Sequence, residues 1–239
     1  MVVQLYLDLL SQPCRSVFIF AKINNIPFKL EFMNLCNGDQ FTEEYAKVNL
    51  LRKVPALKDE DFTLAESVAI LLYLSRKYNT PDHWYPSDLQ KRARVDEYLS
   101  WQHTSVRPNA GVLLWMKVMI PKNFNISCPA EKIDTAVETL NDTLKEFESK
   151  FLQDKAFIAG EEISIADLVA YSELMQAFFV DINIFEGRPK LAAWRQRVES
   201  KIDQDILDEA HKSIRNANQR IIEPAVAEAY KTRLLKFIR

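Results

Sequence analysis

The chain has 239 residues, a formal net charge of −2 and 48% hydrophobic residues, so it is long enough for one large domain or two small ones. This near-neutral charge argues against nucleic-acid binding, which usually requires a strong basic excess. No apolar run reaches the roughly 18–20 residues that a membrane-spanning helix needs. The sequence opens on a strand pattern rather than on a secretory signal. We therefore expect a globular protein with neither nucleic-acid nor membrane partners.

The cysteine and histidine content indicates a reducing compartment and no metal site. The three cysteines, Cys14, Cys36 and Cys128, are odd in number and widely spaced, which does not suit a disulfide framework. The sequence contains no CxxC motif, and its three histidines lie far apart. We therefore expect a cytoplasmic protein that holds no metal ion.

The first third of the chain alternates between strand patterns and helix patterns. The predicted elements are, in order, a strand over 3–8, a helix over 13–24, a strand over 28–33, a short helix over 42–49 begun by Thr42, a hairpin over 54–64 and a helix over 66–78. A strand–helix–strand unit implies a parallel pair of strands with a right-handed crossover. The hairpin that follows makes the predicted sheet mixed.

The rest of the chain predicts helices almost throughout. Residues 79–87, NTPDHWYPS, contain two prolines and no helical period, which is typical of a linker. The predicted helices that follow cover 88–121 with a kink at Pro108, then 130–152, 164–179, 188–200, 204–218 and 223–238.

These patterns predict an α/β domain over 1–78, a linker over 79–87 and an all-helical domain over 88–239. One helix start is especially clear. Ser164 has the properties of an N-cap and Asp167 stands three residues later, which is the spacing of a capping box.

The turn Ser11-Gln12-Pro13-Cys14 lies between the first predicted strand and the first predicted helix. Serine is a favoured N-cap, and proline is tolerated in a first helical turn, so Ser11 could be only a cap. A strand-to-helix turn also brings free N–H groups and the helix dipole to one place, where a hydroxyl can help to bind an anion. The two interpretations are compatible.

Two further segments have the chemistry of a peptide-like ligand site. Val54 precedes Pro55 and is therefore extended, and a cis bond would expose its main-chain N–H and C=O to an extended peptide. Most X–Pro bonds are trans, however, and Lys53 is by composition a solvated charge. Glu66 and Ser67 open a helix and could hold an amino-acid head group, although an ordinary acidic first turn looks the same. Together with an anion site, these parts match glutathione.

Several long blocks of the sequence resemble the theta-class glutathione transferases. They read "LYLDLLSQPCR", "KVPALKD-DFTL-ESVAILLYL-RKY", "WYP-DLQ-RARVDEYL-WQHT", "ISIADL" and "FEGRPKLAAWRQRVE". The similarity extends over nearly the whole chain and is weaker at about 109–130, 176–184 and 212–239. It implies an N-terminal thioredoxin-like domain with a mixed four-stranded sheet, a C-terminal all-helical domain, a homodimer and a cis bond before Pro55.

The resemblance also implies roles for individual residues. Ser11 matches the serine that hydrogen-bonds the glutathione sulfur, and Arg233 matches a position of the C-terminal helix that faces the active site. By composition alone, that C-terminal stretch is a solvated basic helix. The residues that match glutathione-binding positions are Gln12, Gln40, Lys53, Val54, Pro55, Glu66 and Ser67. The residues that match the electrophile side are Arg107, Trp115 and Met116.

The resemblance implies an enzyme that uses glutathione as a co-substrate and needs no cofactor. Its thiolate would attack haloalkanes, epoxides and sulfate esters, and would also reduce organic hydroperoxides. Gln40 stands where close relatives often carry His, and Phe41 where some carry Lys, so this part of the site adds no charge. Two other functions remain open. Cys14 could form a mixed disulfide with glutathione, or the fold could serve binding without catalysis.

Overall fold

A four-stranded mixed sheet forms the N-terminal part of the computed structural model, which describes residues 2–230. The strands are β1 (Val3–Leu7), β2 (Phe28–Phe32), β3 (Ala56–Asp59) and β4 (Phe62–Ala65), in the spatial order β2-β1-β3-β4. β1 pairs in parallel with β2 and antiparallel with β3, and β3 pairs antiparallel with β4. The predicted strands and the mixed sheet are confirmed.

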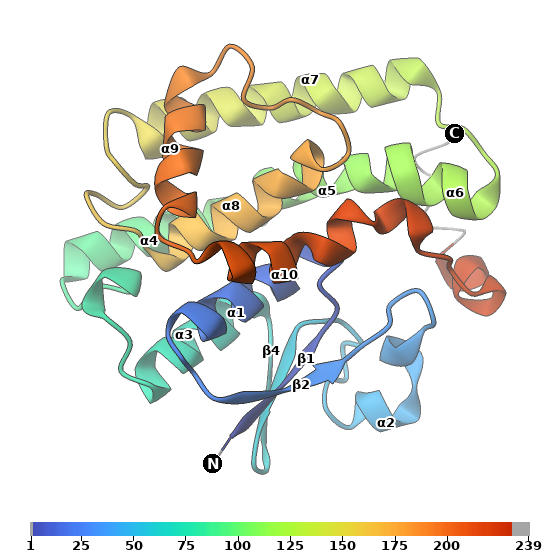
Figure 1. Ribbon diagram of the computed structural model, residues 1–239, viewed down its shortest axis with the longest axis horizontal. Helices are drawn as coiled ribbons and strands as arrows, with labels where there is room; N and C mark the ends of the chain where they lie inside the picture. Colours follow the sequence, from blue (N-terminus) through green and yellow to red (C-terminus); the bar gives the residue numbers. More distant parts are fainter. Residues whose placement is uncertain (1, 231–239) are drawn as a thin grey trace.

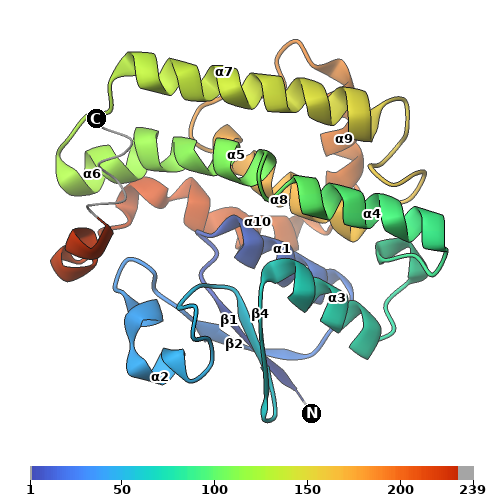
Figure 2. The ribbon, with the colours of Figure 1, turned by 180° about the vertical axis from the view of Figure 1, so that it is seen from behind.

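Helices cover the sheet on the side that faces the rest of the molecule. α1 (Gln12–Ile23) connects the parallel strands β1 and β2, and together with α3 (Ser67–Lys77) it lies between the sheet and the helical part (Figures 1 and 2). The short α2 (Glu43–Ala46) lies on the far side, and the Thr42 hydroxyl caps it, as predicted, by accepting the N–H of Tyr45. Every second side chain of β1, those of Val3, Leu5 and Leu7, is fully buried and faces this helical layer.

The segment between α3 and the helical part is anchored rather than free. It contains a short 3₁₀ helix, Asp82–Trp84. Trp84 is 2% exposed and its ring packs edge-on against Phe20 of α1, with the ring centroids 5.4 Å apart. The segment therefore contributes to the core of the first domain.

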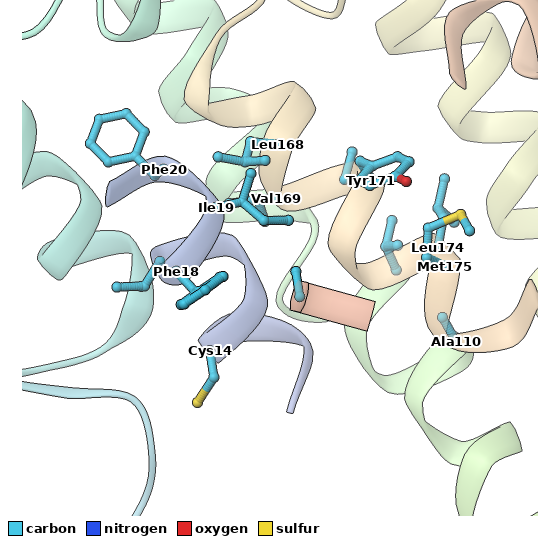
Figure 3. Packing of buried hydrophobic residues seen from close by; sticks show 14 of the residues in the cluster. Cys14, Phe18, Ile19, Phe20, Ala110, Leu168, Val169, Tyr171, Leu174 and Met175 are labelled. Atoms are coloured by element: carbon cyan, nitrogen blue, oxygen red, sulfur yellow. The ribbon is translucent and has the colours of Figure 1, made fainter. Parts of the chain in front are cut away.

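The helical part is built around one central helix, α8 (Ile165–Phe178), in which every residue except Phe178 is buried. Its side chains are apolar nearly all round, which is the pattern of a helix enclosed by neighbours. Figure 3 shows Ile19 pointing from α1 toward α8, where Val169 lies. The surrounding helices are α4 (Leu89–Trp101), α5 (Val106–Leu114), α6 (Ile120–Phe124), α7 (Ala130–Glu146), α9 (Pro189–Glu199) and α10 (Gln204–Arg215).

The predicted continuous helix over 88–121 is wrong in one respect. The helix breaks at 102–105 into α4 and α5, and Pro108 lies in the first turn of α5 instead of at a kink. The N–H groups of a first helical turn make no hydrogen bond within the helix, so a proline, which has no N–H, costs little there. A π-helical turn, Trp115–Met119, then joins α5 to α6.

The predicted capping box at the start of α8 is confirmed. The Ser164 N–H donates to Asp167 Oδ2 at 2.9 Å. The other oxygen of Asp167 accepts the Ile158 N–H at 2.8 Å and the Trp194 Nε1–H at 2.9 Å. This buried carboxylate therefore joins three segments of the helical part, which the local pattern alone did not indicate.

The C-terminal helix is described only in part. Residues 224–230 are helical, in agreement with the helix predicted over 223–238. Arg233 lies outside the described residues. Among residues 2–230, the structure contains no helix with the length and apolar character needed to cross a membrane.

Candidate active site

The residues predicted to bind glutathione lie along one edge of the sheet. β3 runs antiparallel to both β1 and β4, so β1 and β4 end at the edge where β3 begins. Ala56, the first residue of β3, pairs with Ala65, the last residue of β4. Pro55 and Glu66 are therefore neighbours, and Ser11 follows β1 at the same edge. Strand pairing therefore brings the turn at Ser11 close to segments that lie more than 40 positions later in the sequence.

A cavity of about 630 Å³ lies between this edge and the helical part. Its N-terminal wall is formed by the turn that contains Ser11 and by Leu35 after β2. The opposite wall is formed by α5 and the π-helical turn, by Gln176 of α8 and by Tyr230 near the end of the described chain. The size is that of a pocket for a small organic substrate.

Ser11 occupies the N-cap position of α1, but its hydroxyl caps no helical N–H. The residue is half-buried and lines the cavity. Its Oγ lies within hydrogen-bonding reach of the Cys14 thiol. A hydroxyl at a helix N-terminus that is not used by the helix is available to donate to an anion in the cavity.

The turn before Ser11 is held by a buried carboxylate that the sequence analysis missed. Asp8 is fully buried, and its Oδ1 accepts the Leu10 N–H at 3.0 Å. Its Oδ2 accepts the Leu35 N–H at 3.1 Å and Arg220 Nη2 at 2.6 Å. A charged residue at the end of an apolar strand was the signal that could have revealed it.

The bond between Val54 and Pro55 is cis, as the resemblance implied. In the described part of the chain, the N–H and C=O of Val54 have no hydrogen-bond partner, so they are free to pair with an extended ligand. The preceding carbonyl, that of Lys53, is fixed by the Tyr45 hydroxyl at 2.6 Å and by Asn49 Nδ2 at 2.8 Å. The side chain of Lys53 is exposed.

Glu66 has a strained backbone at the start of α3. Its φ of +69° lies in the left-handed region, where a non-glycine residue is unfavourable. Such strain often accompanies a functional site. The geometry leaves the Glu66 carboxylate exposed and turns the buried Ser67 and the helix N-terminus toward α5.

Arg107 connects the start of α3 to the helical part. Its Nε donates to Glu173 Oε1 at 2.8 Å, and its Nη2 donates to Ser67 Oγ at 3.3 Å. Its Nη1 lies 3.2 Å from His103 Nδ1, and burial together with the Arg107 charge lowers the pKa of His103, which favours the neutral ring that accepts this bond. Burial raises the pKa of Glu173, and Arg107 opposes that rise. Arg107 thus places a positive charge in the cavity wall.

The structure corrects the prediction for Met116. Trp115 lines the cavity, whereas Met116 is 3% exposed, clusters with Ile120 and Cys128 behind the lining residues, and does not line the cavity itself. Met119 lines the cavity instead, because it follows Trp115 by four residues and shares the same helix face.

Gln40 and Gln12 have different surroundings. Gln40 is 2% exposed, and its Nε2 donates to the Leu35 carbonyl at 3.3 Å and to the Tyr230 hydroxyl at 3.1 Å. Both amide hydrogens are therefore engaged, and donation to a ligand carboxylate would require the Tyr230 contact to break. Gln12 lines the cavity and closely approaches Gly111, where an added Cβ would lie 2.8 Å from Gln12 Nε2.

Cys14 does not have the properties of a redox centre. It is fully buried, and burial raises the pKa of its thiol to about 12. In Figure 3 its side chain points away from α8. Reactive cysteines need the opposite, an accessible thiol with a lowered pKa. Across residues 2–230, moreover, no group of three or more His, Cys, Asp or Glu side chains is arranged to hold a metal ion.

A thioredoxin-like domain joined to a helical domain, with a cavity-facing serine at the N-terminus of the first helix between them, is the architecture of the glutathione transferases. The family models agree. Residues 11–77 match the model described as "Glutathione S-transferase, N-terminal domain", and residues 108–201 match "Glutathione S-transferase, C-terminal domain".

Individual relatives narrow the class. The chain is 53% identical to "Glutathione S-transferase theta-3" of Mus musculus over 97% of both chains. It is 55% identical to "Glutathione S-transferase theta-1" of Homo sapiens over 91% of this chain and 90% of the relative. The solved structure "Human glutathione-S-transferase T1-1, apo form" is 52% identical and superimposes with a TM-score of 0.94 over 99% of this chain and 100% of its own. The chain belongs to the theta class of the glutathione S-transferase family and is a glutathione transferase.

Proposed function

We propose that Ser11 activates the thiol of glutathione for attack on small electrophiles. The observation that carries this proposal is the Ser11 hydroxyl, which stands at the N-terminus of α1, caps none of its N–H groups and lines the cavity. A free thiol of pKa roughly 8.5 is mostly protonated at neutral pH, and lowering that pKa by about two units requires about 2.7 kcal/mol. A hydrogen bond from a hydroxyl to a charged acceptor contributes roughly 1.5–3 kcal/mol, and the helix N-terminus adds to it.

Glutathione would lie along the sheet edge. Its cysteinyl unit pairs with the free main chain of Val54 beside Pro55, and its γ-glutamyl head contacts Glu66 and Ser67 at the start of α3. The exposed Lys53 would attract the glycyl carboxylate. The remaining residues that we assign to glutathione are Gln12, at the cavity wall, and Gln40, whose donation requires release from Tyr230.

The electrophile would lie against α5. The thiolate attacks the electrophilic carbon, the bond from that carbon to the halide or sulfate breaks, and the leaving group departs with the electron pair. Arg107 stabilises this departing anion, while Trp115 and Met119 provide apolar contact. A solved human theta-class relative, 43% identical over 99% of this chain and 100% of its own with a TM-score of 0.93, is described as a complex with "the glutathione conjugate of 1-menaphthyl sulfate". This supports sulfate esters as substrates of this chain. Haloalkanes and epoxides are proposed on the chemistry of the thiolate alone.

We further propose a peroxidase activity toward organic hydroperoxides. The thiolate attacks a peroxide oxygen, the O–O bond breaks and the alcohol leaves after protonation. A second glutathione then displaces hydroxide from sulfur, so two glutathiones and one hydroperoxide yield the disulfide, the alcohol and water. Arg233 remains a predicted second catalytic residue.

We propose that the enzyme is a cytoplasmic homodimer with domains at 1–78 and 88–239 joined by a linker at 79–87. All three cysteines are free and buried, in keeping with a reducing compartment. Sedimentation of the pure protein would measure its oligomeric state.

The test is the ultraviolet absorbance of the bound glutathione thiolate as a function of pH, in the wild type and in Ser11→Ala. We expect the substitution to raise the thiolate pKa and to lower turnover about tenfold or more, while glutathione binding changes little. Cys14→Ser is the control and should keep full conjugating activity. An unchanged thiolate pKa in Ser11→Ala would refute the mechanism.

A further inference from the structure

Arg15 is a fully buried cation behind the turn that carries the cavity-facing serine. Its Nη1 donates to the carbonyl oxygens of Leu9 and Leu10, each at 3.0 Å. Its Nη2 donates to the Ser172 carbonyl at 3.1 Å and to Gln176 Oε1 at 2.6 Å. The guanidinium therefore holds the main chain just before the serine and attaches it to α8.

The acceptors around Arg15 are all neutral. The neighbouring Asp8, in contrast, has a direct ionic partner in Arg220 at 2.6 Å. Burial lowers the pKa of Arg15 to about 10, so the group stays cationic at neutral pH. A charge enclosed in the low-dielectric interior with only dipoles as partners exerts its field over a longer distance than a surface charge.

This charge lies close to the proposed thiolate. Leu10, whose carbonyl Arg15 binds, is adjacent to Ser11, and both residues line the cavity. Gln176, which accepts the shortest bond from Arg15, lines the cavity as well. The same place receives the positive end of the α1 dipole. Among the described residues, no carboxylate forms a direct ion pair with Arg15. Glu173 and Asp8 interact with it electrostatically from further away, but each has another arginine as its direct partner, so the Arg15 charge also acts on an anion in the cavity.

We infer that Arg15 is a positioning residue for the transfer reaction: it orients the backbone that presents Ser11 and supplies a fixed positive charge that favours the thiolate over the thiol. This inference rests on the proposed function, because it concerns the anion that Ser11 is proposed to bind.

Other charged groups surround the same position. Those on the elements packed around α1 and the cavity are Asp8, Cys14, Glu66, Arg107, Tyr171, Glu173 and His211. Burial raises the pKa of Tyr171, so its hydroxyl stays uncharged near neutral pH. Burial raises the pKa of Cys14 to about 12 and lowers that of His211 to about 3, so neither titrates near neutral pH. Asp8 is paired with Arg220, and Glu173 with Arg107. All of them are common to the wild type and its Arg15 variants, so a difference between these proteins reports on Arg15.

The decisive experiment compares Arg15→Met and Arg15→Lys. Both lose hydrogen bonds and should lose thermal stability, but only Lys keeps a positive charge. We expect Arg15→Met to raise the pKa of the bound thiolate by about one unit. Its activity loss should therefore be largest at low pH and should shrink as the pH rises. Arg15→Lys should have a thiolate pKa nearer to that of the wild type.

A purely structural role predicts a different result. Both variants would then lose activity equally at every pH with an unshifted thiolate pKa, and this outcome would overturn the inference. If Arg15→Met does not fold, Gln176→Glu offers a second test. It keeps an oxygen that accepts the Arg15 hydrogen bond and adds a negative charge that pairs with the guanidinium. The matched control is Asn109→Asp, at another cavity-lining amide. Gln176→Glu should raise the thiolate pKa more than Asn109→Asp, and equal shifts would contradict the role of Arg15.

The wild-type measurement separates the two proposals. If the wild type does not lower the thiolate pKa, or if Ser11→Ala leaves it unchanged, the proposed function fails. If the wild type lowers it, Ser11→Ala raises it and Arg15→Met does not, only the role of Arg15 fails.

Discussion

The two sides of the cavity are built in different ways. The sheet-edge half presents Ser11 and the N-terminus of α1 to the cavity. The main chain of Val54 and the start of α3 at Ser67 lie along the same edge outside the cavity lining, in positions that follow from strand pairing. The helical half presents side chains of α5 and of the turn after it. They include Arg107, Trp115 and Met119.

The difference has a physical consequence. Main-chain groups stay in place when a side chain changes, so the binding of a substrate to them depends on the fold and little on individual side chains. Side chains on one helix face can change the shape and charge of the cavity without moving the sheet. We therefore expect the sheet-edge half to govern glutathione binding and the helical half to govern the choice of electrophile.

The largest effect should come from the ion pair that ties the C-terminal segment to the sheet-edge half. Arg220→Met leaves the fully buried Asp8 carboxylate without its ionic partner, which should lower the free energy of unfolding by about 3 kcal/mol. Denaturant unfolding measures this. Arg215→Met is the matched control, because it breaks an exposed ion pair with Asp208 and should cost less than about 1 kcal/mol. Equal losses would show that the buried pair does not stabilise the turn.

An intermediate effect should come from the helical half. Arg107→Met removes the positive charge in the cavity wall, so kcat/KM for 1-menaphthyl sulfate should fall about tenfold, while the glutathione KM changes less. The double variant Arg107→Met/Glu173→Gln also removes the unpaired buried carboxylate and separates stability from catalysis.

Lys117→Met is the control for Arg107→Met. It also removes a positive charge, but from the π-helical turn that follows α5, and the Lys117 side chain does not line the cavity. If Arg107→Met lowered kcat/KM equally for every electrophile, or changed the glutathione KM more than kcat, the helical half would not govern the choice of electrophile.

The smallest effect should come from the side chains of the sheet-edge half that are proposed to bind the γ-glutamyl head of glutathione. Glu66→Gln and Ser67→Ala should each raise the glutathione KM about three- to tenfold and leave kcat unchanged, because these contacts are equal in the ground and transition states. Steady-state kinetics with two different electrophiles measure this. Glu60→Gln, at the exposed hairpin turn, controls for the charge change in Glu66→Gln. A large loss of kcat at saturating glutathione would contradict the assignment.

Local patterns predicted most elements but failed where packing decided. The helical pattern over 88–121 contained no local stop at 102–105, yet the chain breaks there, where Gln102 is fully buried and its carbonyl accepts the N–H of Arg107. Met116 and Met119 are equally apolar in sequence. Both lie in the π-helical turn Trp115–Met119, and only the packing of that turn against its neighbours decides that the face shared by Trp115 and Met119 is the one toward the cavity.

The sequence by itself determined the order of strands and helices, the capped start of α8, and, through its resemblance to a family, the enzyme class. Periodicity, capping and turn chemistry act over a few residues, so they can be read locally. Only the tertiary structure decided that Asp8 pairs with Arg220 and that Arg15 lies behind Ser11 with neutral partners. The Asp8–Arg220 and Arg15–Gln176 contacts join residues more than 150 positions apart, and a buried charge finds such partners only when packing brings distant segments together.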